Sequence, residues 1–411
     1  MHARSLIGML IALIGPAACR PAAPRFGPPT TVARAGATVP TVAVDEGGTT
    51  YVVWVERSPD STLNVMLAHA HRGAAFSPAV RVNDRPGDVL SSKEEPPQVV
   101  VGPSGQLVVA WIGETPLPGS DRSDVSVRVA RSRDRGATFL PPVSVWPAEL
   151  GHPRADFYHD IAIGPDGRVY VSWLDLHEYA DWAAARDAAH QPRRPHGADA
   201  SEPLFAQLMV GESSDRGTTF GPPARLDTIA CICCRSAIAA SPDRAVHAMW
   251  RHVFPGSVRD FVTARAGSDS AFAPPKRVHS DGWVIDGCPD IGPGITSDDR
   301  GAIHVAWFTG AGAGAGLYYA VSRDQGATFS APMRLRSGRA PAEAKLASLG
   351  DAAWLTWEDT RTMDPTIRFG PVGDSIGTVL ASGRVPAIAA GGGVIAVAWE
   401  RTGSVQVVRT P

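Results

Sequence analysis

The octapeptide Ser132-Arg133-Asp134-Arg135-Gly136-Ala137-Thr138-Phe139 decides the fold of this chain, because its pattern returns twice. Residues 213–220 read Ser-Ser-Asp-Arg-Gly-Thr-Thr-Phe, and residues 322–329 read Ser-Arg-Asp-Gln-Gly-Ala-Thr-Phe. All three copies share Ser-x-Asp-x-Gly-x-Thr-Phe. A pattern of this length does not recur by chance at long intervals, so it predicts a fold built from repeated units.

Each octapeptide is expected to form a hairpin turn. Ser and Asp side chains bond nearby backbone N–H groups, glycine adopts a positive φ, and phenylalanine packs back between sheets. We therefore interpret Asp134, Asp215 and Asp324 as structural residues rather than catalytic ones. Less complete copies of the turn occupy residues 69–76 and 265–272.

A second repeat sets the number of units. Apolar residues alternate in seven segments that each end in tryptophan, namely 48–54, 105–111, 167–173, 244–250, 301–307, 351–357 and 393–399. Alternation with a period of two, bounded by turn residues, is typical of half-buried strands. The tryptophans are 57, 62, 77, 57, 50 and 42 residues apart, close to the length of a four-stranded propeller blade. The pattern predicts an all-β, seven-bladed β-propeller.

The two ends of the chain are predicted to close the ring. The last unit supplies only three strands, at residues 387–390, 394–399 and 404–408, and residues 30–33 are free to supply the fourth. Pairing the ends removes the exposed sheet edges. The short last spacing leaves a six-bladed ring as the alternative.

The octapeptide is the Asp box of the sialidase-like, or BNR-repeat, propellers, and the chain resembles that superfamily over residues 28–411. Sialidase catalysis needs an arginine triad, an Asp acid/base and a tyrosine nucleophile late in the chain. Here the last tyrosines, Tyr318 and Tyr319, fall within a third-strand pattern, and the Arg-Ile-Pro motif of the first blade is absent. The resemblance therefore implies the fold, but none of the catalytic residues can be carried over. The family's true sialidases also have six blades rather than seven.

The N-terminus resembles an export signal. Arg4 precedes an apolar stretch at residues 6–14, and Ala17-Ala18-Cys19 follows as a small-residue cleavage site. We expect a signal peptide over residues 1–18, lipidation of Cys19, a Pro-rich tether over 19–29 and the propeller over 30–411. Ordinary signal cleavage without lipidation is the alternative. Either way, the expected location is the bacterial periplasm or the cell surface.

Composition excludes some classes of partner. The net charge of −2 provides no basic surface for nucleic acid, and only a lipid anchor would link the chain to a membrane.

Four cysteines remain once Cys19 is set aside. Cys231, Cys233 and Cys234 precede the first strand of the fourth blade, and Cys288 precedes that of the fifth. Cys231 and Cys288 each lie 19 residues before the tryptophan of their blade, so we expect them side by side. Two interpretations stay open: disulfides, which export favours, or a thiolate site for Cu(I) or Zn.

The same counting predicts the polar residues of the channel. Glu94, Asp156, Cys233 and Asp290 each lie 17 residues before a tryptophan. The other residues expected to bind ligand near them are Arg154, His159, Asp160 and Arg235. An insertion at 177–203 is expected to leave the third blade, with a helix-forming stretch at 179–189 and solvated histidines at 177, 190 and 196.

These features favour an exported module that binds a glycan, a protein or a metal, with a Cys-rich centre at the channel mouth. Fold alone does not decide function. A glycoside hydrolase of sialidase-like type and a metal or redox accessory protein of the cell envelope are the alternatives.

Overall fold

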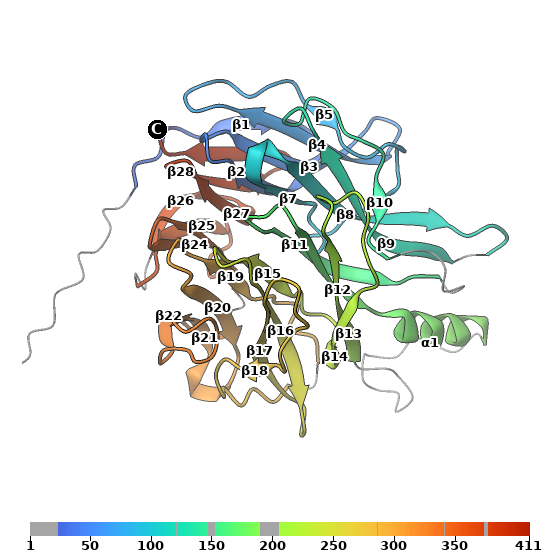
Figure 1. The fold of residues 1–411 in the computed structure, drawn as a ribbon, viewed down its shortest axis with the longest axis vertical. Helices are drawn as coiled ribbons and strands as arrows, with labels where there is room; N and C mark the ends of the chain where they lie inside the picture. The colour runs from blue at the N-terminus through green and yellow to red at the C-terminus, as the bar shows by residue number, and fades with distance from the viewer. Residues whose placement is uncertain are drawn as a thin grey trace, which may run out of the picture.

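The computed structural model describes residues 24–120, 122–146, 153–189, 205–285, 287–340, 342–373 and 377–411. Almost all regular structure within them is β-strand, with one α-helix, α1 (His177–Ala188), and two short 3₁₀ turns. The strands form six sheets placed around a common centre (Figure 1). No described helix has the length and hydropathy needed to cross a membrane.

Five sheets have four or five strands, and neighbouring strands run antiparallel. One sheet contains β2 (Ala37–Val44), β3 (Thr50–Arg57), β4 (Leu63–Ala70) and β5 (Val80–Arg81), and the next contains β6 (Val89–Leu90), β7 (Gln98–Val101), β8 (Leu107–Pro116), β9 (Ser123–Ser132) and β10 (Val143–Ser144). Two more contain β19 (Gly294–Ser297), β20 (Ile303–Thr309), β21 (Gly316–Ser322) and β22 (Met333–Ser337), and β23 (Ala344–Leu349), β24 (Ala352–Asp359), β25 (Thr366–Pro371) and β26 (Thr378–Ser382). The fifth contains β1 (Thr30–Ala33), β27 (Arg384–Gly391), β28 (Val394–Arg401) and β29 (Ser404–Arg409).

The sixth sheet has eight strands. It contains β11 (Asp156–Ile163), β12 (Val169–Asp175), β13 (Phe205–Ser213) and β14 (Ala224–Cys231), followed by β15 (Ala237–Ala240), β16 (Val246–Phe254), β17 (Val258–Ala266) and β18 (Lys276–Arg277). Only one residue pair, Ala230 opposite His252, joins β14 to β16. The first four strands and the last four therefore each have the same internal order as a smaller sheet.

The tryptophan segments are strands, as the alternation predicts. Each tryptophan lies on the strand that directly follows β2, β7, β11, β15, β19, β23 or β27, and these are called the first strands below. All seven tryptophans are at most 1 % exposed: Trp54, Trp111, Trp173, Trp250, Trp307, Trp357 and Trp399. The core thus lies between neighbouring sheets. The first strands β2, β7, β11, β15, β19, β23 and β27 contact one another in succession, and β27 contacts β2.

The predicted closure of the ring by the chain ends is confirmed. Strand β1 pairs antiparallel with β29, with Thr30 opposite Val407 and Thr31 opposite Gln406. Because β29 belongs to the sheet of β27 and β28, residues from both ends of the chain complete one four-stranded sheet.

The turn chemistry predicted for the octapeptides is also confirmed. In the first copy Gly136 has φ 89° and donates its N–H to Ser132 Oγ at 2.7 Å. Asp134 accepts the backbone N–H of Thr138 at 2.9 Å. The other two copies repeat these bonds, and the three phenylalanines pack against hydrophobic clusters between sheets.

Some sequence predictions lie outside the described residues. These are the signal peptide at 1–18, Cys19 with the first residues of the tether, and residues 190–203 of the insertion, including His190 and His196. The part of the insertion that the structure describes is α1, which supports the helix-forming interpretation of 179–189.

Candidate functional site

A cavity of about 1230 Å³ occupies the centre of the ring. Residues of all seven first strands line it, and Figure 1 shows β2, β7, β11, β15, β19 and β27 around the centre. Its charged residues are Lys93, Glu94, Asp160, Arg235, Asp290, Glu343, Lys345, Glu358, Arg384 and Glu400. The cavity combines an apolar wall with acids and bases that can bond a polar ligand.

The structure separates the predicted ligand-binding residues into two groups. Glu94, Asp160, Arg235 and Asp290 line the cavity, whereas Arg154, Asp156 and His159 are not among its lining residues.

The three residues outside the cavity have partners elsewhere. Arg154 forms an ion pair with Asp124 at 2.5 Å. Asp156 is 2 % exposed, and burial together with the nearby charge of Asp175 raises its pKa well above the usual range. The buried His159 places Nε2 3.3 Å from the carbonyl oxygen of Ala110.

One side of the cavity holds a connected charged group. Arg235, which precedes β15, forms an ion pair with Glu343, which precedes β23. Lys345 Nζ lies 2.6 Å from the same carboxylate. Burial alone would raise the pKa of Glu343, but the charges of Arg235 and Lys345 hold it at about 2. This carboxylate is therefore ionised, and it orients two cations at the cavity wall.

Asp160 lies in the same cavity on β11. Its carboxylate accepts the backbone N–H of Ile238 at 3.0 Å and of Ile161 at 2.9 Å. Burial raises its pKa, and the charge of Lys345 opposes that rise. Asp160 thus ties β11 to β15 and also contributes to the charged side of the cavity.

Three first strands carry a β-bulge where they enter the cavity. The register shifts within β2, β11 and β27, and Val39, Tyr158 and Val385 have positive φ there. In each case the backbone N–H at the bulge is accepted by a glutamate from the neighbouring part of the ring: Glu400 for Val39, Glu95 for Tyr158 and Glu358 for Val385. A bulge bends its strand and turns later side chains to a new direction.

Sequence reasoning missed Glu343 and Lys345. The prediction took the residue at one fixed distance before each tryptophan, whereas Glu343 and Lys345 lie fewer residues before Trp357 than that distance. The signal for them was present as alternating charges, Glu343 and Lys345, at the start of an otherwise apolar first strand.

Two acidic residues that line the cavity, Glu94 and Asp290, lie near each other. Glu94 forms an ion pair with Lys93 at 3.1 Å. Desolvation, followed by the like charge of Glu94, raises the pKa of Asp290. Asp290 and Glu94 are therefore close enough for the charge of Glu94 to act on the ionisation of Asp290.

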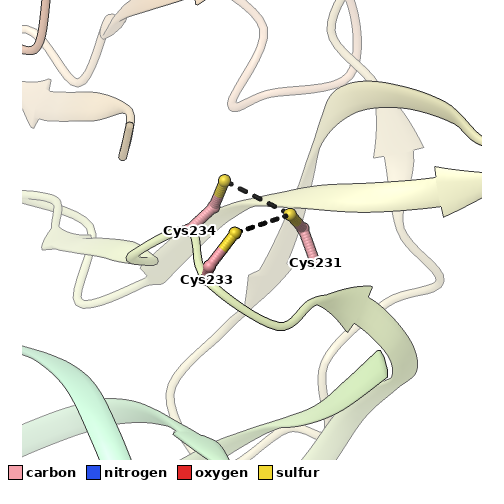
Figure 2. A group of neighbouring side chains, drawn as sticks. All are labelled: Cys231, Cys233 and Cys234. Atoms are coloured by element: carbon pink, nitrogen blue, oxygen red, sulfur yellow. Dashed lines mark hydrogen bonds between the residues drawn. The ribbon is translucent and has the colours of Figure 1, made fainter. Parts of the chain in front are cut away.

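Three cysteine sulfurs meet in the turn that follows β14 (Figure 2). Cys231 Sγ lies 3.3 Å from Cys234 Sγ and 3.9 Å from Cys233 Sγ, and all three residues are at most 6 % exposed. Hydrogen bonding with the two neighbouring thiols, aided by the charges of Arg259 and Arg251, places the pKa of Cys231 well below its usual range.

Cys288 joins this group through a different residue than the sequence predicts. The expected neighbour was Cys231, but Cys288 Sγ instead lies within 4.8 Å of Cys233 Sγ and of a carboxylate oxygen of Asp290. The four cysteines come from the end of β14, the turn between β14 and β15, and the segment before β19. All four thiols are free in the structure.

Comparisons with known proteins find similarity in fold alone. No family model matches the sequence, and no curated protein matches it either. Among solved structures, a Hadza microbial sialidase aligns over 85 % of this chain and 73 % of its own, with a TM-score of 0.51 and 12 % identity.

Two polysaccharide lyases are also similar. An ulvan lyase, bound to -[GlcA(1-4)Rha3S]-, covers 93 % of this chain and 95 % of its own at a TM-score of 0.55 and 10 % identity. The polysaccharide lyase Uly1 covers 90 % and 88 %, with a TM-score of 0.55 and 8 % identity. These neighbours are consistent with a sialidase-like propeller fold.

Proposed function

We propose that this chain binds a glycan in its central cavity. The observation that carries the proposal is the charged group of Arg235, Glu343 and Lys345, held by ion pairs at the wall of a cavity of about 1230 Å³. Sugar hydroxyls both donate and accept hydrogen bonds, so a wall of oriented acids and bases suits them. The fold shared with a sialidase and with a lyase bound to an oligosaccharide supports this ligand class.

The proposal is tested by titrating the protein with a panel of soluble glycans, including sialylated, sulfated uronate-containing and neutral ones, in a calorimeter. Lys345→Ala should weaken binding of the glycan that the wild type prefers by about tenfold or more, which corresponds to loss of one charged hydrogen bond. Lys276→Ala, on the exposed strand β18, is the matched control. Equal binding by both variants would reject the cavity as the site.

A second candidate, a glycoside hydrolase, rests on the pair of Glu94 and Asp290. Both line the cavity, and glycosidases use a pair of carboxyl groups. The raised pKa of Asp290 suits the one that donates a proton. No tyrosine is among the described residues that line the cavity, so a tyrosine nucleophile has no support there.

The hydrolase candidate is tested with chromogenic glycosides, a sialoside among them. Asp290→Asn and Glu94→Gln should each abolish turnover, while Asp187→Asn, on the exposed surface of α1, should not. Glycan binding without turnover of any substrate would leave the binding module as the function.

We also propose that the ring has seven blades. The succession of seven first strands and the single residue pair between β14 and β16 support an interpretation of the eight-stranded sheet as two blades. An experimental structure with six separate blades would contradict it.

We propose further that the chain is exported and anchored through Cys19. The support is the sequence alone: an apolar stretch followed by a small-residue pair before cysteine. Metabolic labelling with a palmitate analogue tests it, because Cys19→Ser should lose both the label and the membrane fraction. An unlabelled wild type in the soluble fraction would favour plain secretion.

A further inference from the structure

The three buried sulfurs of Cys231, Cys233 and Cys234 face one another within a single turn of chain (Figure 2). Their separations of 3.3 and 3.9 Å from Cys231 are close to those of thiolates around one metal ion, whose Zn–S bonds are about 2.3 Å long. Strand pairing holds the turn in place, since Cys231 is opposite Phe205 on β13. The set is therefore organised before any ion arrives.

Two buried arginines lie beside these sulfurs. Arg259, 4 % exposed, donates from its Nη1 to Cys231 Sγ at 3.2 Å. Arg251, 1 % exposed, bonds the carbonyl oxygens of Arg259 and Phe308 and lies over the ring of Phe261.

Neither arginine is paired with a carboxylate among the described residues. Each also has a buried Nε without a hydrogen-bond partner there. Burying a cation is costly unless an anion accompanies it. Cys231, whose sulfur accepts a hydrogen bond from Arg259, is the group placed to supply that negative charge.

We propose that Cys231, Cys233 and Cys234 bind one Cu(I) ion as thiolates. Sulfur ligands favour soft ions such as Cu(I), and the charge is balanced, since three thiolates offset one Cu(I) and two guanidinium groups. On binding, every S–H bond still present breaks, its proton passes to solvent, and a Cu–S bond forms in its place. Copper enters and stays as Cu(I), so no electron is transferred.

Cys288 supplies a way in. It is exposed, and its sulfur lies within 4.8 Å of Cys233 Sγ and of Asp290, which lines the central cavity. Cys233 thus connects the buried trio to the cavity. An ion captured by Cys288 and Cys233 can pass to the trio by exchange of one sulfur ligand at a time. This site does not depend on the proposed glycan function.

Zinc binding and disulfide formation are two other uses of these cysteines, and each would group the sulfurs differently. Zn(II) prefers four ligands, which would need Cys288 as a full member although it is not grouped with Cys231 and Cys234. Oxidation would join Cys231 to Cys234, the closest sulfurs, and Cys233 to Cys288. Both are outcomes of the test below.

The test titrates Cu(I) into the reduced wild-type protein under anaerobic conditions, in competition with the chromogenic chelator bicinchoninate. We expect one Cu(I) per chain, with the ultraviolet charge-transfer absorption of a copper thiolate. Cys231→Ser and Cys234→Ser should each weaken binding more than about 100-fold, since disturbing only an outer partner of a metal ligand costs about 10–100-fold.

Cys288→Ser is the matched control and should change the affinity less than about tenfold while slowing metal uptake. Circular dichroism checks the fold of each variant. The absorption and the Cu(I) stoichiometry of the wild-type protein test the proposal even if a variant fails to fold. No Cu(I) bound by the reduced wild type overturns the proposal. So does a site that takes Zn(II) in preference and loses it equally in Cys288→Ser, or a chain that is isolated with two disulfides and takes no Cu(I) after reduction.

Discussion

Glu95 accepts the backbone N–H of Tyr158 with both carboxylate oxygens, at 2.8 and 3.0 Å. Tyr158 has φ 58° and lies at the bulge of β11. Glu95 precedes β7, so it fixes the bulge of the neighbouring first strand. The bonds from Val385 to Glu358 and from Val39 to Glu400 repeat this relationship at two other places on the ring. The bulges that shape the cavity are thus held from the neighbouring sheet.

Glu95→Ala should therefore destabilise the fold. Glu95 is 4 % exposed, and its loss leaves the N–H of Tyr158 without a partner in a buried place, which costs about 1–3 kcal/mol. Urea unfolding followed by tryptophan fluorescence measures the change. Glu94→Ala is the control, because its ion pair with the exposed Lys93 should contribute less than about 1 kcal/mol. Equal stability of the two variants would contradict a structural role for Glu95.

The octapeptide turns should make the stability of the fold sensitive to acid. Hydrogen bonds from Thr138 and Ser132 lower the pKa of Asp134 to about 2, and Asp215 and Asp324 have pKa values of about 2 as well. In the unfolded chain these carboxyls titrate near 3.8. The unfolded state therefore binds more protons between these values, so the turns' contribution is present above about pH 4 and is lost as the pH falls through about 2.

A variant with asparagine at residues 134, 215 and 324 checks this sign. Its urea midpoint should lie below that of the wild type at pH 5 to 7, and the gap should close as the pH falls toward 2.5. Asp187→Asn, on α1, should show no such gap. A gap that stays constant with pH would mean that the ionised carboxylates do not stabilise the turns.

Local chemistry explains which parts of the fold the sequence predicts. The octapeptide turns and tryptophan strands depend on residues near one another in the chain, and the structure places them as expected. The pairing of β1 with β29 joins distant residues, and the sequence predicts it because the last unit supplies only three strands. The cavity depends on bulges that have no clear local signal. Asp156 precedes the bulge of β11 and stays buried near Asp175, whereas Asp160 follows it and faces the cavity.

The sequence also predicts the wrong neighbour for Cys288, because a residue's distance from the tryptophan does not fix its place relative to the strands. Equal distances from Trp250 and Trp307 predict that Cys231 and Cys288 are neighbours, but Cys231 is the last residue of β14 whereas Cys288 lies in the segment before β19. Their positions are therefore not equivalent, and Cys233, in the turn between β14 and β15, is the residue that meets Cys288.

Removing β1 should open the ring. A chain that begins at residue 34 lacks the strand that pairs with β29, which leaves the buried Val405 and Val407 on an exposed edge. Exposed edge strands pair with other chains. We expect a lower melting temperature and self-association in size-exclusion chromatography. A chain that begins at Thr30 keeps β1 and serves as the control. Identical melting and elution of the two would show that the closing pair adds nothing to stability.

The pKa of Asp290 should shift in opposite directions when each of its two charged neighbours, Glu94 and Lys93, is replaced by a neutral residue. The negative charge of Glu94 raises the pKa of Asp290 and the positive charge of Lys93 lowers it, after the larger effect of desolvation. Glu94→Gln should therefore lower the pKa of Asp290, because the ionised form no longer faces a like charge. Lys93→Gln should raise it, because the ionised form loses an attractive charge.

Carbon-13 NMR of protein labelled at the aspartate carboxyls follows this titration, and Asp290→Asn identifies the signal. In Glu94→Gln the pKa should still lie above its usual range, since desolvation remains. Shifts of the same sign in both variants would mean that the substitutions alter the solvent access of Asp290 rather than the local electric field. In that case Glu94 and Asp290 would not act as a pair, and the hydrolase candidate would lose its supporting observation.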